Sequence, residues 1–196
     1  MKLLWLLFSV GSSLVLLGCG GNEPAEFAGY ERVPVPEVGQ LSVPEAGGDD
    51  FAFVASEGGV LLVYFGYTSC PDVCPTTLSD VRSALAKIDE PERVELAMIT
   101  VDPERDTDEV IVGYVESFVP TAHGLRTEHD SVLRAAAAEF GADYSVGVAS
   151  DGEPEVAHTG SLYAVNDAGQ MVLTWPFGTS SDDIGSDLEL LLREAS

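Results

Sequence analysis

The sequence is poor in basic residues. Of its 196 residues, nine are Lys or Arg and 33 are Asp or Glu, which leaves a formal net charge of −24 at pH 7. A surface of this sign repels phosphate backbones and anionic lipid headgroups, which argues against a nucleic-acid partner. Charge of one sign also destabilises a compact chain by self-repulsion, and salt screens this repulsion. The acidity indicates either a halophilic source or an acidic extracytoplasmic protein.

A long apolar run is found only at the start of the chain. Lys2 precedes an apolar stretch from Leu3 to Leu17, followed by Gly18 and Cys19. The stretch is short for a membrane-spanning helix and is typical of a secretory signal. Residues 16–19 also resemble the lipobox of bacterial lipoproteins, which implies cleavage before Cys19 and a lipid on its sulfur. The alternative is an uncleaved membrane anchor. Either way, we expect the rest of the chain to face the extracytoplasmic side of the cell membrane.

The remaining chain divides into a tether and one folded domain. Residues 1–18 are the predicted lipoprotein signal peptide, and residues 19–40 are the predicted flexible linker because glycine and proline interrupt any regular element there. Residues 41–196 form the predicted domain, whose length allows one full core.

The domain alternates strand and helix patterns. Apolar runs predict strands at 51–54, 60–65, 94–101, 144–148, 162–165 and 171–175, with a hairpin turn at 166–169. Helical spacing predicts helices near 75–88, from 106 to about 118 with Asp106 and Glu109 as a capping box, from 131 to 140, and at the C-terminus. This order predicts an α/β fold with a central mixed sheet flanked by helices.

Two of the three cysteines stand where the second predicted strand passes into a helix. Cys70 and Cys74 each precede a proline, which disfavours helical backbone at the cysteine itself. Near a helix start the dipole favours a thiolate, so we expect a lowered thiol pKa. A dithiol at this junction is the thioredoxin arrangement, although three residues separate the cysteines here instead of two.

The function of the pair can be narrowed. With Cys19 assigned to lipid attachment, Cys70 and Cys74 are the two cysteines left, and each can form a disulfide only with the other. A disulfide that closes so short a loop restrains the unfolded chain little, so a structural staple explains the pair poorly. Redox exchange and metal binding remain. His158 lies just before the predicted strand at 162–165 and is the candidate third ligand of a copper or zinc site, whereas His123 and His129 are expected to be solvated surface residues.

Three motifs together resemble the Sco/SenC copper chaperones. They are Phe65-Gly66-Tyr67-Thr68-Ser69-Cys70-Pro71-Asp72-Val73-Cys74-Pro75-Thr76-Thr77, Val101-Asp102-Pro103-Glu104-Arg105-Asp106-Thr107 and Ala157-His158-Thr159. The resemblance covers roughly residues 41–196 and implies a thioredoxin-like fold. It also implies that Cys70, Cys74 and His158 bind one copper ion. One departure is the small Thr159-Gly160-Ser161 segment, which predicts a flexible loop after the histidine.

The resemblance further implies a metallochaperone that matures the dinuclear copper site of cytochrome c oxidase subunit II. Soft Cu(I) is satisfied by two thiolates, whereas Cu(II) prefers an added nitrogen, so His158 should matter most for Cu(II). Asp102 and Asp106 are candidates to orient a ligand, or simply helix-start residues. Another copper donor or a thioredoxin-like reductant is a further expected partner.

The alternative function is a thiol–disulfide oxidoreductase, an enzyme that uses Cys70 and Cys74 to reduce the copper-site cysteines of the apo-oxidase. The two functions share chemistry, because a dithiol must be reduced to bind metal and can also reduce another disulfide by exchange. They differ at His158, which copper binding needs and disulfide exchange does not.

Overall fold

The computed structural model describes residues 26–150 and 152–195. Its main sheet has six strands in the order β1-β10-β9-β4-β5-β6. These strands are β1 (Tyr30–Glu31), β4 (Val60–Gly66), β5 (Val94–Thr100), β6 (His123–Leu125), β9 (Leu162–Val165) and β10 (Met171–Trp175). The mixed sheet expected from the sequence is therefore present, with β4, β5 and β6 parallel and β9, β10 and β1 antiparallel to their neighbours.

The two central strands are apolar because both faces of the sheet are covered. Every residue of β4 is buried, and Val60 pairs with Val94 while Gly66 pairs with Thr100 at the other end. Parallel strands covered on both faces read as continuous hydrophobic runs rather than as an alternation. This register brings the carboxyl ends of β4 and β5 to the same edge of the sheet, where the chain enters its functional loops.

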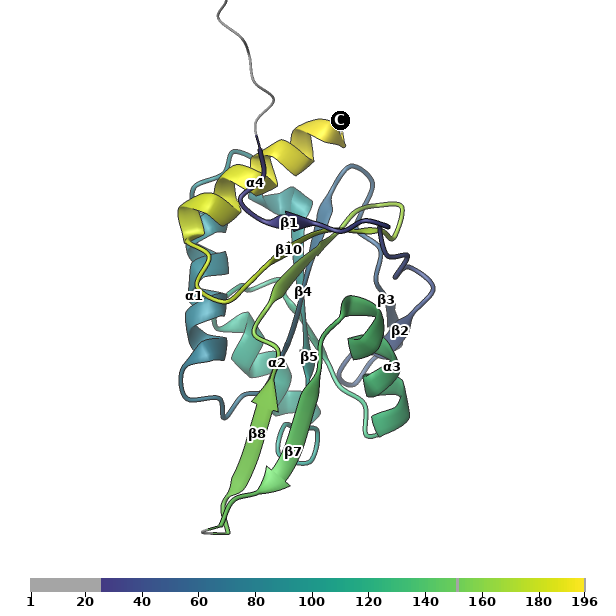
Figure 1. The fold of residues 1–196 in the computed structure, drawn as a ribbon, viewed down its shortest axis with the longest axis vertical. Helices are drawn as coiled ribbons and strands as arrows, with labels where there is room; N and C mark the ends of the chain where they lie inside the picture. Colours follow the sequence, from purple (N-terminus) through teal and green to yellow (C-terminus); the bar gives the residue numbers. More distant parts are fainter. Residues whose placement is uncertain (1–25, 151, 196) are drawn as a thin grey trace, which may run out of the picture.

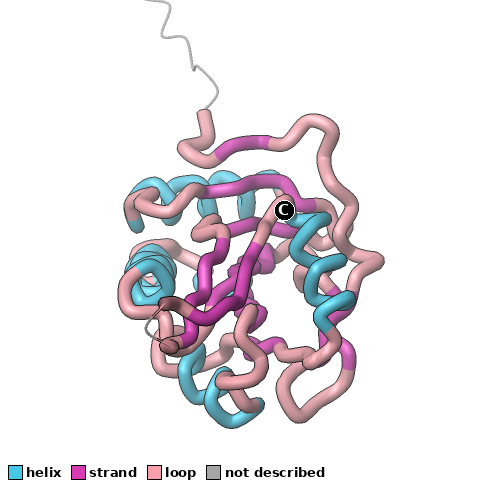
Figure 2. Tube along the Cα trace, turned by 60° about the horizontal axis from the view of Figure 1, so that its bottom comes forward, coloured by secondary structure: helices cyan, strands magenta, loops and turns pink. Residues whose placement is uncertain are grey.

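Helices cover the sheet on both sides (Figures 1 and 2). They are α1 (Val73–Leu85), α2 (Asp108–Glu116), α3 (Asp130–Phe140) and α4 (Ser181–Glu194), with a short 3₁₀ turn at Pro91–Arg93. Helix α1 packs against α4 on one side of the sheet, α2 lies beside β6, and α3 lies on the other side from α1 (Figure 1). The architecture is the predicted thioredoxin-like α/β fold.

Two small ribbons stand apart from the main sheet. Strands β2 (Ser42–Pro44) and β3 (Asp50–Ala52) form one, and β7 (Tyr144–Val148) and β8 (Pro154–His158) form the other. The β7–β8 hairpin projects from the body at the end opposite the point where the described chain begins (Figure 1). The sequence predicted β7 but not β8, because residues 154–158 lack the apolar alternation of an ordinary strand.

The described part of the predicted linker belongs to the domain. Strand β1 pairs with β10, Val38 is fully buried, and the amides of Ala28 and Gly29 donate to the buried carboxylate of Asp187. Proline and glycine exclude a long helix here but do not prevent packing as a short edge strand. Within the described residues, the predicted end of the linker at residue 40 is therefore corrected. The domain starts earlier than residue 41.

The predicted capping box at Asp106 is wrong. The N-cap of α2 is Thr107, whose hydroxyl accepts from the amide of Val110 at 3.4 Å. Asp106 is fully buried, and its carboxylate accepts hydrogen bonds from Thr68 and Thr100 instead. Two other predicted boundaries are confirmed: Gly141 closes α3 in the left-handed conformation, and the 166–169 turn joins β9 to β10.

No helix among residues 26–150 and 152–195 is both long and apolar enough to cross a membrane. The predicted signal peptide, the lipid-attachment residue Cys19 and the first part of the predicted linker lie outside the described residues.

Candidate metal centre

The two cysteines flank the start of α1, directly after the central strand β4. The chain turns at Gly66, and the amide of Cys70 donates to the carbonyl of Tyr67. Cys74 is the second residue of α1, which begins two residues earlier than the predicted start at 75. Its amide donates to the Cys70 sulfur at 3.3 Å, so the Cys70 sulfur lies against an amide at the helix start. Both cysteines are free thiols, Cys74 buried and Cys70 half-buried.

His158 ends β8 and brings the third donor from a distant part of the chain. Its Nε2 lies 3.4 Å from the Cys74 sulfur, 84 residues away in sequence. The two sulfurs and an imidazole nitrogen all lie within 4.8 Å of one another. At metal–donor distances of about 2.0–2.3 Å, donors on one ion stand up to about 4.6 Å apart, so this set is close to the dimensions of a metal site.

The histidine is held in the tautomer that a metal requires. Its Nδ1 lies 3.1 Å from the carbonyl of Thr159, which can only accept, so Nδ1 carries the proton and Nε2 keeps its lone pair. Burial lowers the pKa of the His158 imidazole, which keeps the ring neutral. A neutral ring with Nε2 aimed at the thiols is ready to bind a cation.

The expectation of a lowered thiol pKa fails at Cys74. Burial raises the pKa of the Cys74 thiol to about 12, because removing the sulfur from water disfavours the thiolate more than the helix start favours it. In the metal-free protein Cys74 is therefore a neutral thiol at physiological pH. Metal binding must displace its proton.

Tyrosines from the β4 end of the sheet enclose the imidazole. The ring of Tyr64 lies 6.0 Å from the His158 ring and the ring of Tyr67 lies 5.7 Å from it, both edge to face. These are packing contacts, as expected from the sequence. Burial raises the pKa of Tyr64 and Tyr67, so both hydroxyls stay protonated.

Asp106 supports the cysteine loop without contacting the donors. It accepts from the amide of Thr68 at 3.0 Å, from the Thr68 hydroxyl at 2.5 Å and from the Thr100 hydroxyl at 2.6 Å. Thr68 precedes Cys70 by two residues, so Asp106 fastens the loop to the end of β5. The sequence pattern singled out Asp106 but predicted that its structural role was to cap the helix.

Asp102 lies one step further from the donors. Its carboxylate pairs with Arg105, and the Arg105 guanidinium lies 5.8 Å from the centroid of the Tyr67 ring. Tyr67 in turn packs on His158. The carboxylates of Asp102 and Asp106 accept hydrogen bonds from Thr68, Thr100 and Arg105, and none of these bonds involves a thiol or the imidazole.

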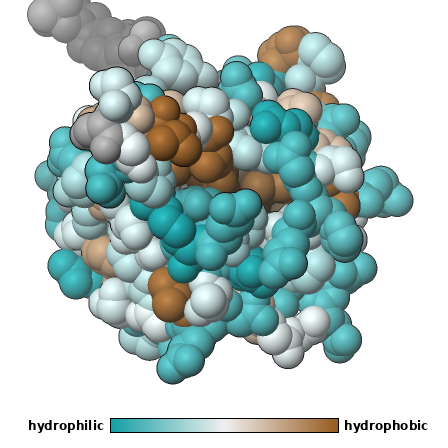
Figure 3. Space-filling view, turned by 90° about the horizontal axis from the view of Figure 1, so that it is seen from below, coloured by the Kyte–Doolittle hydropathy of each residue, from teal (hydrophilic) through white to brown (hydrophobic). Residues whose placement is uncertain are grey.

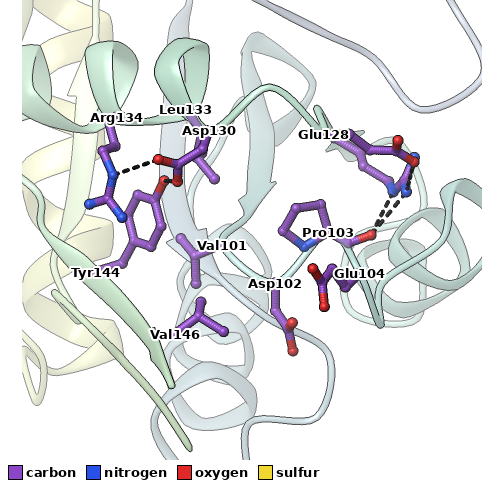
Figure 4. Close-up of a pocket in the computed structure, with 11 residues that line it drawn as sticks. Val101, Asp102, Pro103, Glu104, Glu128, Asp130, Leu133, Arg134, Tyr144 and Val146 are labelled. Atoms are coloured by element: carbon purple, nitrogen blue, oxygen red, sulfur yellow. Dashed lines mark hydrogen bonds and ion pairs between the residues drawn. The ribbon is translucent and has the colours of Figure 1, made fainter. Parts of the chain in front are cut away.

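The loop after the histidine is pinned, contrary to the flexibility expected of small residues. The amide of Thr159 donates to the carbonyl of Asp143 at 2.9 Å, and the amide of Asp143 donates to the Thr159 hydroxyl at 3.0 Å. Tyr144, which pairs with His158 across the hairpin, donates its hydroxyl to Asp130 at 2.7 Å (Figure 4). The sequence could not show these contacts because they join α3, β7 and β8.

The other two histidines lie outside this centre. His123 is half-buried in β6, not a solvated surface residue: its Nδ1 lies 2.8 Å from Glu45, and its ring packs on Phe51. His129 is exposed and is the N-cap of α3, where its side chain makes no capping hydrogen bond. Neither histidine belongs to the grouped donors.

The donor set suits a soft metal ion. Two thiolates and one imidazole are the ligands that favour copper, and a closed structural zinc site would usually have four ligands. Among the described residues, Cys70, Cys74 and His158 are the one group of three or more Cys, His, Asp or Glu side chains with this geometry. These three residues would hold a copper ion, which is a soft and redox-active cation.

Comparison with known proteins also points to copper binding. A family model described as SCO1/SenC matches residues 37–193. A protein of Stutzerimonas stutzeri described as a putative copper-binding protein is 29% identical over 134 residues, which cover 67% of this chain and 65% of that protein. This chain thus spans just under two thirds of that relative's length.

Solved structures share the fold. The apo Sco1 protein of Thermus thermophilus is 33% identical with a TM-score of 0.74, covering 85% of this chain and 97% of that one. Arabidopsis thaliana ScoI, solved with copper bound, is 26% identical with a TM-score of 0.70, covering 80% and 99%. The family match, the fold and the grouping of two thiols with one imidazole agree. The chain belongs to the SCO1/SenC family, and the solved structures that it resembles include one with copper bound.

Proposed function

We propose that this protein is a copper metallochaperone that binds one copper ion through Cys70, Cys74 and His158. It passes the ion to the dinuclear copper site of cytochrome c oxidase subunit II. Lipid on Cys19 holds the protein at the membrane, and the domain faces the extracytoplasmic side. The observation that carries the proposal is the grouping of two thiols and one correctly protonated imidazole within 4.8 Å.

The burial of the donors supports delivery of cargo rather than catalysis on a substrate. Cys74 is enclosed, while Cys70 is half-buried at the loop before α1. An ion held here is shielded on the Cys74 side and reachable from the Cys70 side. A copper-accepting thiolate of a partner can therefore replace the ligands one at a time, starting with Cys70.

A thiol–disulfide oxidoreductase is the second candidate, and one observation favours it. Both thiols are free, and the Cys70 sulfur is the more accessible of the two. In this reaction the Cys70 thiolate attacks a partner disulfide and one partner thiolate leaves. Cys74 then loses its proton and attacks the mixed disulfide, which leaves a Cys70–Cys74 disulfide and a reduced partner. His158 has no required part in this sequence.

Anaerobic copper titration of the purified full-length protein tests the proposal. Wild type should bind one equivalent of copper and show a thiolate-to-Cu(II) absorption band. Cys70→Ala and Cys74→Ala should each abolish the band. His158→Ala should remove Cu(II) binding while Cu(I) binding to the thiols persists. The matched control is His129→Ala, an exposed histidine outside the centre, which should behave as wild type.

Each outcome favours one function. Stoichiometric copper uptake that depends on His158 supports the chaperone. Failure of wild type to bind copper, together with rapid disulfide exchange that His158→Ala leaves intact, overturns it in favour of the oxidoreductase.

A further inference from the structure

The β7–β8 hairpin has one apolar face that begins at the metal ligand. Residues directly opposite in an antiparallel pair point to the same side, and alternate positions along a strand share a face. The register therefore places three cross-strand pairs on one face: Tyr144 with His158, Val146 with Val156, and Val148 with Pro154. The other face carries the pairs Ser145 with Ala157 and Gly147 with Glu155. We call the first set the hairpin strip.

The hairpin strip becomes more exposed with distance from the metal ligand. Tyr144 is buried and His158 is half-buried, whereas Val146 is 51% exposed and Val148 is 74% exposed. Exposed valines in consecutive pairs on a projecting ribbon leave apolar surface in water, and a partner protein could bury that surface. Figure 3 looks onto this end of the molecule and shows an apolar patch surrounded by polar surface.

A groove runs beside the hairpin strip. Its volume is about 590 Å³, and its apolar lining comes from Val101, Pro103, Leu133, Tyr144 and Val146. In the close-up, Val146 and Val101 lie next to each other across the groove (Figure 4). The groove adds charged side chains to this apolar lining, among them Asp102, Glu104 and Glu128. The hairpin strip itself leads from solvent to the hairpin rung carrying His158.

The margin of this surface is acidic. Residues 141–162 contain four acids and no Lys or Arg. The arginines beside the groove are already paired: Arg105 with Asp102, Arg126 with Glu128 at 2.7 Å, and Arg134 with Asp130 at 2.8 Å. An apolar centre with an acidic margin is complementary to an apolar patch with a basic margin.

We propose that the hairpin strip and groove are the docking surface for the copper acceptor, a protein domain with an apolar centre and a basic margin. The inference rests on the proposed function. A domain seated on the strip would have its edge at His158, where the ion must be handed over. A second copy of this chain would bring acidic margins together, and an anionic membrane would be repelled, so neither matches the charges as well.

Copper transfer to the purified soluble copper domain of cytochrome c oxidase subunit II from the same organism tests the surface. The variant is Val146→Thr/Val148→Thr, which keeps β-branched side chains and so preserves the hairpin. The control is Val33→Thr, a 94% exposed valine near β1, at the other end of the molecule. With acceptor below saturation, the double variant should transfer copper roughly tenfold more slowly, since two apolar contacts are weakened, and the control at the wild-type rate.

The copper spectrum of each protein keeps the outcomes separate. All three proteins should show the same thiolate–Cu(II) band, because the substitutions avoid the donors. Equal transfer rates in wild type and double variant overturn the docking surface and leave the proposed function standing. A wild-type dimer that the double variant dissociates, measured by light scattering, also overturns it by identifying the strip as a self-association surface. Copper binding by wild type without transfer overturns delivery to subunit II, and the docking proposal with it.

Discussion

Gly66 gives the Cys74 sulfur its space. A Cβ at this position would lie 2.9 Å from that sulfur, 2.7 Å from the ring of Tyr64 and 3.0 Å from the end of Met98. All three atoms belong to buried side chains, so none can move away freely. The glycine that ends β4 is required by packing around the metal centre.

Gly66→Ala should therefore disturb the centre and the fold together. We expect about 1–3 kcal/mol of destabilisation from overpacking and a loss of roughly 10–100-fold in copper affinity, because the added methyl displaces a ligand. Thermal unfolding and competitive copper titration measure the two effects.

Gly113→Ala is the matched control for this substitution. Gly113 is exposed within α2, and a Cβ there would meet nothing within 4 Å. The control should gain roughly 0.5–1 kcal/mol of stability and leave copper affinity unchanged. Wild-type copper affinity in Gly66→Ala would show that the Cys74 sulfur tolerates displacement.

Single residues also show where sequence reasoning ends. The spacing of Cys70 and Cys74 and the order of the three motifs were enough to select the donors. Burial of Cys74 was not visible in the sequence, because it depends on α1 packing against the sheet, and it reverses the expected direction of the thiol pKa. The role of Asp106 was hidden for the same reason, since Thr68 and Thr100 lie on separate segments.

At the scale of elements, α4 fastens the start of the described chain to the domain. Asp187 is 2% exposed and accepts from the amides of Ala28 and Gly29 at 3.0 and 2.9 Å. Its carboxylate also accepts from the indole of Trp175 at 2.8 Å. Three donors converge on one buried acceptor, which explains why the domain begins before β1.

Asp187→Asn should release this contact. An amide presents an NH₂ group where only acceptors fit, so at least one donor loses its partner at a cost of about 1–3 kcal/mol. Denaturant unfolding measures the loss, and hydrogen exchange at Ala28 and Gly29 should accelerate. Glu189→Gln on the same helix is the control: its 3.8 Å pair with Arg193 is exposed, so removing the same charge should cost less than about 1 kcal/mol. Equal losses in the two variants would rule out a specific anchor.

The elements that the sequence predicted are those with strong local signals. Strands β4 and β5 have apolar runs, and α3 has a glycine stop. Strands β1, β2, β6 and β8 are two to five residues long, too short for an apolar alternation to mark them. Strands β1 and β6 also depend on partners distant in sequence, β10 and β5. One of these, β8, carries His158, and the position of this ligand relative to the cysteines was therefore predicted from the resemblance and not from any strand pattern.

At the scale of the molecule, charge is the dominant feature. The chain has 33 acids and nine bases, and several arginines serve fixed structural contacts, such as Arg126 with the carbonyls of Pro103 and Asp106. The acids are thus far from neutralised. Folding brings them closer together than in the extended chain, and the resulting repulsion opposes the compact state.

Stability should therefore rise with salt. At about 0.1 M salt the Debye length is roughly 10 Å, so neighbouring surface acids still repel one another. At about 1 M salt it falls to roughly 3 Å, and this repulsion is largely screened. Thermal unfolding in NaCl across this range should show a rising Tm. The variant Glu57→Gln/Asp89→Asn/Glu116→Gln removes three exposed acids that form no ion pair with any other described residue. It should raise Tm at low salt and flatten the salt dependence. A Tm that stays level from dilute buffer to molar salt would contradict both self-repulsion and a halophilic source. A rising Tm with an unchanged slope in the variant would instead locate the effect in salt strengthening of apolar burial, which does not depend on surface charge.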